Sequence, residues 1–340
     1  MLVKGISYSS DKKLARCEMQ YHYNYEEKLQ LKRKKVGLFR GDLGHQLVEA
    51  HFTKSGPGWR QKFDELKTSR WDKIFDEEKE EYGIDFMESL YNLMEHYEEH
   101  WDAWDKNWTV IGVEQEHSIM TKHGWPIRWK VDLLVEEPIK TNSVRRIKGH
   151  DQKRIILVEH KFKKKIPEVE ERLLQPQVHS YAWLLSKKGI TVDTILWDYI
   201  RTEPVPRPMI KKNGELSERK ISTDQRGYLQ SLKDAGIVAK TPEEIIGLEN
   251  KLKELPETLS LERVTNSVNL KMGQEFVKDW VERALRAQNN TRPLRNWTYE
   301  CKFDCDFFLL CQCDMMGQRD RDSLIKINYE SKPSKSEELK

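Results

Sequence analysis

The sequence predicts an α/β fold, in which a mixed, mostly antiparallel central sheet is flanked by helices and carries helical insertions. Short apolar runs with period-two alternation occupy the middle of the chain, whereas the segments on either side repeat their apolar residues at helical spacing. With 340 residues, of which 37% are hydrophobic and 34% charged, the chain can bury a sizeable core beneath a wide polar surface. An aromatic content of 10% excludes a disordered chain.

The first third of the chain is predicted to be helical. Residues 37–52, GLFRGDLGHQLVEAHF, follow a glycine-marked turn and have the composition of a helix. Residues 55–107 are rich in Glu, Lys and Trp, and an apolar stripe within them recurs on one helical face. The members of the stripe are Phe86, Leu90, Leu93, Met94, Tyr97 and Trp101. We therefore expect residues 55–107 to form a helical insertion.

The middle of the chain is predicted to form strands. Alternation or short apolar runs mark four of them, at residues 108–120, 127–136, 155–162 and 194–200. The sequence HGWP at 123–126 would turn the first pair, and residues 138–153 form a basic, polar loop. A helix follows up to Lys188, and its regular part should begin at Pro176, because a missing N–H does no harm in a first turn.

The last third of the chain is predicted to be helical and then irregular. Residues 205–300 are mostly amphipathic and predict a helical C-terminal region. Residues 301–313 hold four of the five cysteines, and residues 319–340 are a polar tail that we expect to be flexible.

Charge and cysteine content restrict the functional classes. The 59 Lys and Arg against 56 Asp and Glu leave a net charge of +3, so a nucleic-acid role must rest on local basic clusters. No run approaches the roughly 20 apolar residues of a membrane span, and the first residues lack the apolar core of a signal peptide. We expect a soluble cytoplasmic protein without membrane contact. In that compartment, clustered cysteines indicate a metal or an iron–sulfur cluster rather than disulfides.

Three charged side chains lie where apolar strands should not hold them. Asp132 lies in WKVDLLVEE, and Glu159 and Lys161 lie in IILVEHKFKKK. Glu159 and Lys161 are two residues apart on a strand and therefore point to the same face. Burying an isolated charge is costly, but a divalent cation between two carboxylates would neutralise them. Carboxylate oxygens suit Mg²⁺ or Mn²⁺, and a lysine beside them would allow metal-assisted hydrolysis of a phosphodiester.

Four motifs, GDLGH, VDLL, VEHK and QVHSY, occur in this order between about residues 37 and 185. Their order resembles the RecB-like branch of the PD-(D/E)XK nuclease superfamily. The residues that match the pattern of that branch are Gly41, His45, Asp132, Glu159, Lys161, Gln177 and Tyr181. The resemblance implies a PD-(D/E)XK-type central sheet and a single nuclease domain over residues 1–318.

The resemblance also implies roles for these residues. His45, Asp132 and Glu159 would ligate one or two Mg²⁺ or Mn²⁺ ions, and Lys161 would assist the attacking water.

Two further pairs of residues join this expected site. Gln177 and Tyr181, which share a helix face at i, i+4, would orient the lysine, the water or the DNA strand. Glu114 or Glu116, on the strand before Asp132, could add an acidic ligand.

The cysteines are similar to those of AddB-type and CRISPR-associated Fe–S nucleases, in which one cysteine before the core and three after it hold a [4Fe–4S] cluster. The resemblance implies that the cluster at residues 301–313 closes onto Cys17, with Cys17, Cys301, Cys305 and Cys311 as ligands. The spacing here is C-x3-C-x5-C instead of the usual C-x2-C-x5-C. Four thiolates also suit zinc, and Cys313 could replace Cys311.

Basic runs predict contacts with a phosphate backbone. The run that starts beside the expected metal site, which includes Lys163, Lys164 and Lys165, is our predicted DNA-binding segment. Residues 28–35 and the arginines at 283–295 are further candidates.

The function we expect is that of a metal-dependent DNA nuclease, an exonuclease on DNA ends or single strands rather than a site-specific endonuclease. Relatives in the RecB-like branch take part in DNA repair and recombination, in bacterial or bacteriophage-infected cells. The sequence has no GxxxxGK[ST] phosphate loop, so helicase activity would come from a partner. Two alternatives are a non-catalytic Fe–S or zinc DNA-binding subunit of a repair or recombination complex, and a redox-sensing regulator.

Overall fold

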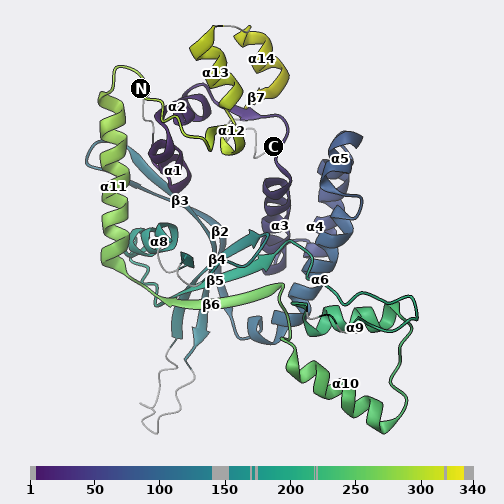
Figure 1. Ribbon diagram of the computed structural model, residues 1–340. Helices are drawn as coiled ribbons and strands as arrows, with labels where there is room; N and C mark the ends of the chain where they lie inside the picture. Colours follow the sequence, from purple (N-terminus) through teal and green to yellow (C-terminus); the bar gives the residue numbers. More distant parts are fainter. Residues whose placement is uncertain are drawn as a thin grey trace, which may run out of the picture.

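A computed structural model gives the fold of the chain (Figure 1). It describes residues 5–139, 153–168, 171–172, 175–217, 219, 221–317 and 320–332. The basic loop expected at 138–153 lies almost entirely outside the described residues. In the part of the chain that the structure describes, no helix is long and apolar enough to cross a membrane.

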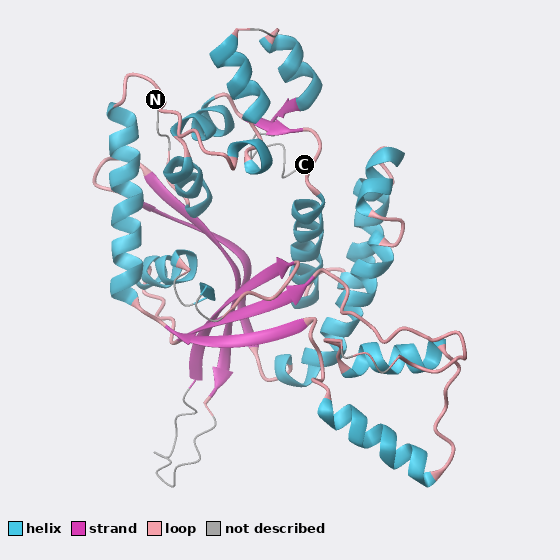
Figure 2. Cartoon of the chain, in the orientation of Figure 1, coloured by secondary structure: helices cyan, strands magenta, loops and turns pink. Residues whose placement is uncertain are grey.

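A five-stranded mixed sheet forms the centre of the molecule, with helices on both sides (Figure 2). Its order is β2 (Thr109–Met120), β3 (Pro126–Pro138), β4 (Lys153–Lys163), β5 (Thr194–Arg201) and β6 (Leu261–Ser267). Only β4 and β5 are parallel among these neighbours, and the other pairs are antiparallel. The predicted α/β fold with a mixed, mostly antiparallel sheet is confirmed.

Strand β6 lies within the region at 205–300, which was predicted to be mostly helical and to contain no strand. The sequence of β6, LERVTNS, places a charged residue on each face, and the Arg263 side chain is fully buried. A buried arginine hides the alternation of apolar and polar residues by which a strand is normally recognised. The helices of this region are α9 (Gln225–Asp234), α10 (Pro242–Glu254) and α11 (Leu270–Asn289), whereas described residues 205–217, 221–224 and 290–300 form no helix.

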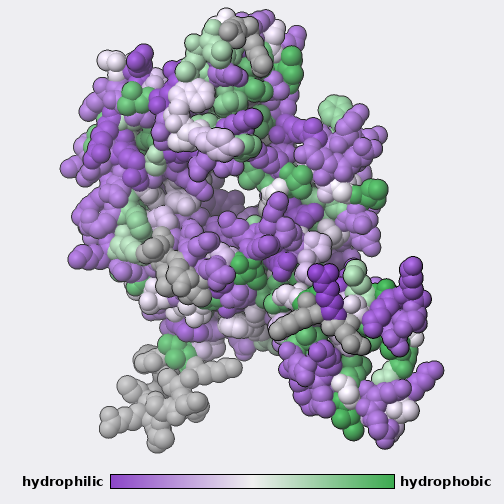
Figure 3. Space-filling model, viewed as in Figure 1, coloured by the Kyte–Doolittle hydropathy of each residue, from purple (hydrophilic) through white to green (hydrophobic). Residues whose placement is uncertain are grey.

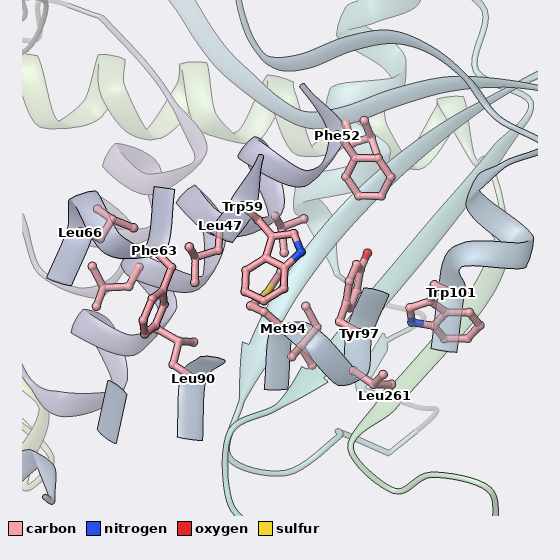
Figure 4. Close-up of a cluster of buried hydrophobic side chains, with 14 of the residues drawn as sticks. Leu47, Phe52, Trp59, Phe63, Leu66, Leu90, Met94, Tyr97, Trp101 and Leu261 are labelled. Carbon is pink, nitrogen blue, oxygen red and sulfur yellow. The ribbon is translucent and has the colours of Figure 1, made fainter. Parts of the chain in front are cut away.

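One face of the sheet is covered by α3 (Val36–Phe52) and by the helical insertion expected at 55–107. The insertion comprises α4 (Trp59–Leu66), the π-helix η2 (Lys67–Trp71), α5 (Asp76–Tyr82) and α6 (Phe86–Asp105). Figure 4 shows side chains from α3, α4 and α6 packed together with Leu261 of β6. The predicted stripe on α6 supplies Phe86, Leu90, Met94, Tyr97 and Trp101 to this core.

The other face is covered by α8 (Pro176–Ser186), α11 and α1 (Tyr8–Arg16). Helix α8 begins at Pro176, as predicted. Helices α8 and α11 approach closely at Gly273, where a Cβ would lie 2.0 Å from the carbonyl oxygen of His179. Any larger residue would therefore separate the two helices.

The two ends of the described chain meet in a small lobe, at the top of Figure 1. Its N-terminal part is α2 (Glu18–Tyr21), the π-helix η1 (His22–Glu26) and β1 (Leu29–Leu31). Its C-terminal part is α12 (Cys301–Asp304), α13 (Phe308–Met316), α14 (Arg321–Asn328) and β7 (Tyr329–Ser331). Strands β1 and β7 pair in antiparallel fashion.

This lobe corrects the prediction of a flexible tail at 319–340. Tyr329 is buried and stacks on Phe307 with ring centroids 5.6 Å apart, and this contact anchors β7. One buried aromatic in a polar sequence is enough to fix a short strand against an existing core. Residues 333–340 lie outside the described part.

Candidate active site

The candidate active site lies at a fork between two strands of the sheet. The pairing of β3 with β4 ends at Leu133 and Val158, so Asp132 and Glu159 are the first residues after the strands separate. The backbone N–H of His160, released from the ladder, donates to Asp132 Oδ2 at 3.1 Å. The fork therefore brings two carboxylates together and binds one of them through the backbone.

Helix α3, which covers the face of the sheet opposite α8, brings His45 to this fork. His45 Nδ1 lies 3.8 Å from Asp132 Oδ2. The close approach of α3 depends on Gly44, because a Cβ at that residue would lie 2.4 Å from the ring of Phe162 on β4. A Cβ at Gly41, the glycine of the sequence motif, would meet only the Phe162 Cβ, at 4.0 Å.

Glu159 and Lys161 form a hydrogen-bonded group with residues of α8. Glu159 Oε1 accepts from Lys161 Nζ and from Gln177 Nε2, the latter at 2.7 Å. Lys161 Nζ also donates to Gln177 Oε1 at 3.2 Å, and Gln177 Nε2 lies 3.4 Å from the Tyr181 hydroxyl. The structure thus places all four of these sequence-predicted residues in one group.

The second oxygen of Glu159 stands out by its lack of a partner. Glu159 is 1% exposed, and within the described residues Oε2 makes no hydrogen bond. Burial, with the nearby Asp132 carboxylate, raises the pKa of Glu159. A buried, unbonded carboxylate oxygen costs free energy, and a cation beside it would remove that cost.

The charges of the neighbouring bases suit such a cation. Burial, with electrostatic repulsion from neighbouring basic groups such as Lys161, lowers the pKa of His45 to about 4, so the His45 imidazole is neutral at pH 7 and can act as a ligand. Burial also opposes the charge of Lys161, but the carboxylates of Glu159 and Asp132 outweigh it and raise the pKa of the lysine. Lys161 is therefore protonated at neutral pH.

Glu114 joins the site from β2, the strand that pairs with the part of β3 that carries Asp132. Ligand atoms of His45, Glu114 and Asp132 all lie within 4.8 Å of one another, and Glu114 also forms an ion pair with Lys130. The backbone of Glu114 has φ +51°, a value that non-glycine residues rarely adopt inside a strand. Such strain is common at functional sites. The donor set of carboxylates and a neutral imidazole fits Mg²⁺ or Mn²⁺.

Two hollows of about 340 Å³ flank this site. One is lined by Lys161, Lys163 and Lys165 together with Trp197 and Tyr199. Lys164, the third residue of the predicted DNA-binding segment, is exposed and is not part of this lining.

The other hollow lies between the start of α1 and strand β3. Glu116 is in its wall with Arg128, Lys130 and Tyr181. Of the two glutamates considered in the sequence, Glu114 therefore belongs to the carboxylate group and Glu116 to the adjacent hollow.

The cysteines gather at a second location, in the terminal lobe. Cys17, Cys301, Cys305 and Cys311 line one cavity of about 120 Å³. Cys313 is buried and lies outside that lining. The Cys17 Sγ accepts from the backbone N–H of Asn296 at 3.5 Å, and the Cys301 Sγ accepts from that of Thr298 at 3.4 Å. The same thiols also donate, Cys17 Sγ to the carbonyl of Leu294 at 3.8 Å and Cys301 Sγ to that of Asn296 at 3.6 Å, and burial raises the pKa of Cys305 and of Cys311.

Two contributors to the site were not predicted from the sequence. Neither the backbone N–H of His160 nor the ion pair of Lys130 with Glu114 was predicted. Lys130 precedes Asp132 by two residues, so strand periodicity could have placed both on one face. The role of the His160 backbone depends on where the two strands separate, which the sequence does not reveal.

Carboxylates, a lysine and a histidine thus gather where two strands of a mixed sheet separate, and this donor set could hold a divalent metal ion. The family model of the PD-(D/E)XK nuclease superfamily matches residues 5–312, and the chain belongs to this superfamily. It is therefore a nuclease of a family that uses divalent metals. The predicted superfamily and its type of sheet are confirmed.

The chain also has a similar solved structure but no curated relative. The chain is similar to the crystal structure of a protein from Eubacterium rectale described as a "Putative exonuclease", with 12% identity and a TM-score of 0.47. The similarity covers 99% of this chain and 92% of that chain. No curated protein matches the chain.

Proposed function

We propose that the protein is a metal-dependent DNA exonuclease of the RecB-like branch, with its active site at the fork between β3 and β4. The observation that carries this proposal is the buried Glu159, whose Oε1 accepts from Lys161 and Gln177 while Oε2 has no partner among the described residues. Lys161 already neutralises Oε1, and a metal ion beside Oε2 would stabilise this carboxylate further; the neutral His45 and the Asp132 carboxylate lie close enough to each other to share one.

The residues of this site have separate tasks. His45, Asp132 and Glu159, with Glu114, would hold one or two Mg²⁺ or Mn²⁺ ions. A bound divalent ion supplies Lewis-acid chemistry to a phosphodiester.

Lys161 acts as a hydrogen-bond donor in this proposal. Because it is protonated, it orients the attacking water and stabilises negative charge on the phosphate rather than removing a proton. Gln177 fixes Lys161 and Glu159 relative to each other through its two hydrogen bonds. Tyr181, beside Gln177, faces the hollow next to the site.

The charge beside the site supports DNA as the substrate. Lys161, Lys163 and Lys165 line one hollow together with Glu168 and Glu171. Burial lowers the pKa of Lys163, and repulsion from Lys161 and from Lys12 on α1 adds to that shift. Figure 3 shows an opening between the terminal lobe and the rest of the molecule. Such an opening would admit a DNA end or a single strand, which favours an exonuclease.

The four gathered thiols support a [4Fe–4S] cluster held by Cys17, Cys301, Cys305 and Cys311. Zinc bound by four thiolates at about 2.3 Å brings the sulfurs within about 3.8 Å of one another. Among the described residues, the group of three ligand atoms within 4.8 Å is that of His45, Glu114 and Asp132, and it includes no thiol. The wider spacing of the cysteines around the cavity suits a cluster better than a single zinc ion.

Digestion of DNA of different topology tests the proposal. Purified protein with Mg²⁺ or Mn²⁺ should degrade end-labelled linear DNA and leave closed circular DNA intact, and Lys161→Ala should abolish the activity. Cleavage of circles by the wild type would indicate an endonuclease. Equal activity of Lys161→Ala would contradict nuclease action at this site, and absence of cleavage with intact DNA binding would favour a non-catalytic DNA-binding subunit.

We further propose that the protein acts in DNA repair or recombination, in the cytoplasm of a bacterial or bacteriophage-infected cell. A partner would supply any helicase activity.

A further inference from the structure

A row of three charged or polar side chains crosses the sheet on the face opposite Glu159 and Lys161. His160 on β4 lies directly beside Asp198 on β5, and Asp198 lies beside Arg263 on β6 in the strand register. All three side chains are buried: those of Asp198 and Arg263 are 0% exposed, and that of His160 is 3% exposed. The proposed mechanism uses none of these side chains.

Hydrogen bonds connect the row. Asp198 Oδ2 lies 3.0 Å from His160 Nδ1 and accepts from Arg263 Nη2 at 3.4 Å. The same oxygen accepts from the Tyr97 hydroxyl at 2.5 Å. Arg263 Nη1 donates to Asp105 Oδ1 at 2.5 Å, at the end of α6.

The stability of the folded protein does not explain why these charged side chains are buried. A buried ion pair loses in desolvation what it gains in attraction, and apolar residues of similar volume often serve the core equally well. Although burial opposes it, Arg263 and the hydrogen bond with His160 lower the pKa of Asp198, so Asp198 remains ionised. Arg263 also lies over Trp101, 4.3 Å from the ring centroid, which holds the guanidinium in place.

The row reaches the metal site through one residue. The His160 side chain contacts Asp198, while its backbone N–H donates to Asp132 Oδ2 at 3.1 Å. The direction of that N–H sets the position of a predicted metal ligand. Beyond the fork, β4 no longer pairs with β3, so the His160 peptide is held by its ladder with β5 and by the contact of the His160 side chain with Asp198 on that same strand.

The other end of the row returns to the helix that carries His45. His51 Nε2 lies 3.9 Å from Asp105 Oδ2, and His51 belongs to α3. The row thus connects the elements that carry two predicted metal ligands, His45 and Asp132.

We infer that Asp198, held by Arg263, is a positioning residue of the nuclease site: it fixes His160 so that the His160 peptide N–H keeps Asp132 in place to bind metal. This inference rests on the proposed function. Removal of a residue that orients a metal ligand typically lowers metal affinity or activity about 10- to 100-fold.

The test measures Mn²⁺ affinity of the full, metal-free chain by titration calorimetry, together with kcat and KM on single-stranded DNA. Asp198→Asn keeps the volume of the side chain and removes its charge. We expect it to weaken Mn²⁺ binding about 10- to 100-fold and to lower kcat, with KM for DNA within about twofold of the wild type. The matched control is Asp102→Asn, an exposed aspartate on α6 that should change neither quantity.

A double variant separates positioning from folding. Asp198→Asn leaves Arg263 with Asp105 as its remaining charge partner, and the loss of one buried partner can destabilise the protein. Asp198→Asn combined with Arg263→Met removes both charges of this pair but leaves Asp105, whose side chain is 10% exposed, without its arginine. The thermal midpoint checks that the double variant is folded, and its Mn²⁺ affinity should stay at least about 10-fold weaker than that of the wild type. Mn²⁺ affinity within twofold of the wild type in this folded double variant would overturn the inference. A wild type that binds Mn²⁺ but cleaves no DNA would contradict the proposed function. In that case the Mn²⁺ affinities of the variants would still decide whether Asp198 positions the metal site.

Discussion

At the residue scale, the site combines a histidine and a glutamate whose pKa values are shifted in opposite directions. His45 has a pKa lowered to about 4, whereas the pKa of Glu159 is raised. Burial disfavours the charged form of both residues, so the metal-free site is under electrostatic strain. A divalent cation would relieve it, because both residues bind metal in their deprotonated forms.

The shift of His45 predicts how stability depends on pH. The unfolded chain binds a proton at this residue below about pH 6.5, whereas the folded protein binds it only near pH 4. The unfolded state therefore holds more protons in this window, and the metal-free protein should lose stability as pH falls from about 6.5 to 4. His45→Asn should make this loss shallower, measured by urea denaturation at each pH. Parallel pH profiles for the two proteins would refute the shift.

Most of the site residues could be predicted, because their chemistry conflicts with their place in apolar strands. Asp132, Glu159 and Lys161 interrupt strands that are otherwise apolar, and the structure brings them together with His45, Gln177 and Tyr181. Asp198 was not predicted, although it also interrupts an apolar strand. Its role depends on the register of three strands, and register is a property of the folded sheet.

At the element scale, the contact between α3 and β4 determines how close His45 comes to the carboxylates. Gly44 permits that contact, and Gly41 of the sequence motif is not pressed against any neighbour. The order of the motif therefore identified the correct helix, while the steric requirement falls on the neighbouring glycine.

Alanine substitutions of the two glycines should have opposite effects. Gly44→Ala places a Cβ 2.4 Å from the Phe162 ring and should lower the free energy of unfolding by about 1–3 kcal/mol. Gly41→Ala meets only ordinary van der Waals contact and should raise it by up to about 1 kcal/mol, because alanine favours the helix. Urea denaturation of both variants checks the pair. Equal effects would show that α3 and β4 do not pack as described.

Element positions could be predicted where the burial pattern is simple. Strands β2 to β5 begin and end within two residues of their predicted bounds, because apolar runs and alternation define them. Strand β6 and the segment from α14 to β7 could not be predicted. Their order depends on tertiary contacts of Arg263 and Tyr329, which local patterns do not contain.

At the scale of the whole molecule, the terminal lobe joins residues that are almost 300 positions apart. Glu27 pairs with Arg321, and Tyr23 donates to Asp314 at 2.6 Å. A metal cluster in the same lobe would strengthen this closure, because four thiolates from both ends would share one cofactor.

Substitution of single cysteines tests this closure. The purified protein should be brown and absorb near about 400 nm through thiolate–iron charge transfer. Cys17→Ser should abolish this absorbance and lower the thermal midpoint, because it releases the N-terminal side of the cluster. Cys313→Ser should retain both properties, since Cys313 lies outside the cavity lining. Zinc in place of iron in the wild type would correct the cofactor, and unchanged stability of Cys17→Ser would refute the closure.

The most direct measurement of the central claim compares Glu159→Gln with the wild type for both cleavage and binding of single-stranded DNA in Mn²⁺. The substitution keeps the size of the side chain and removes the charge that a metal requires. We predict that cleavage falls at least about 100-fold, while DNA affinity stays within about twofold because phosphate contacts lie elsewhere. Cleavage by Glu159→Gln at the wild-type rate would contradict a metal-dependent nuclease site at the fork of β3 and β4.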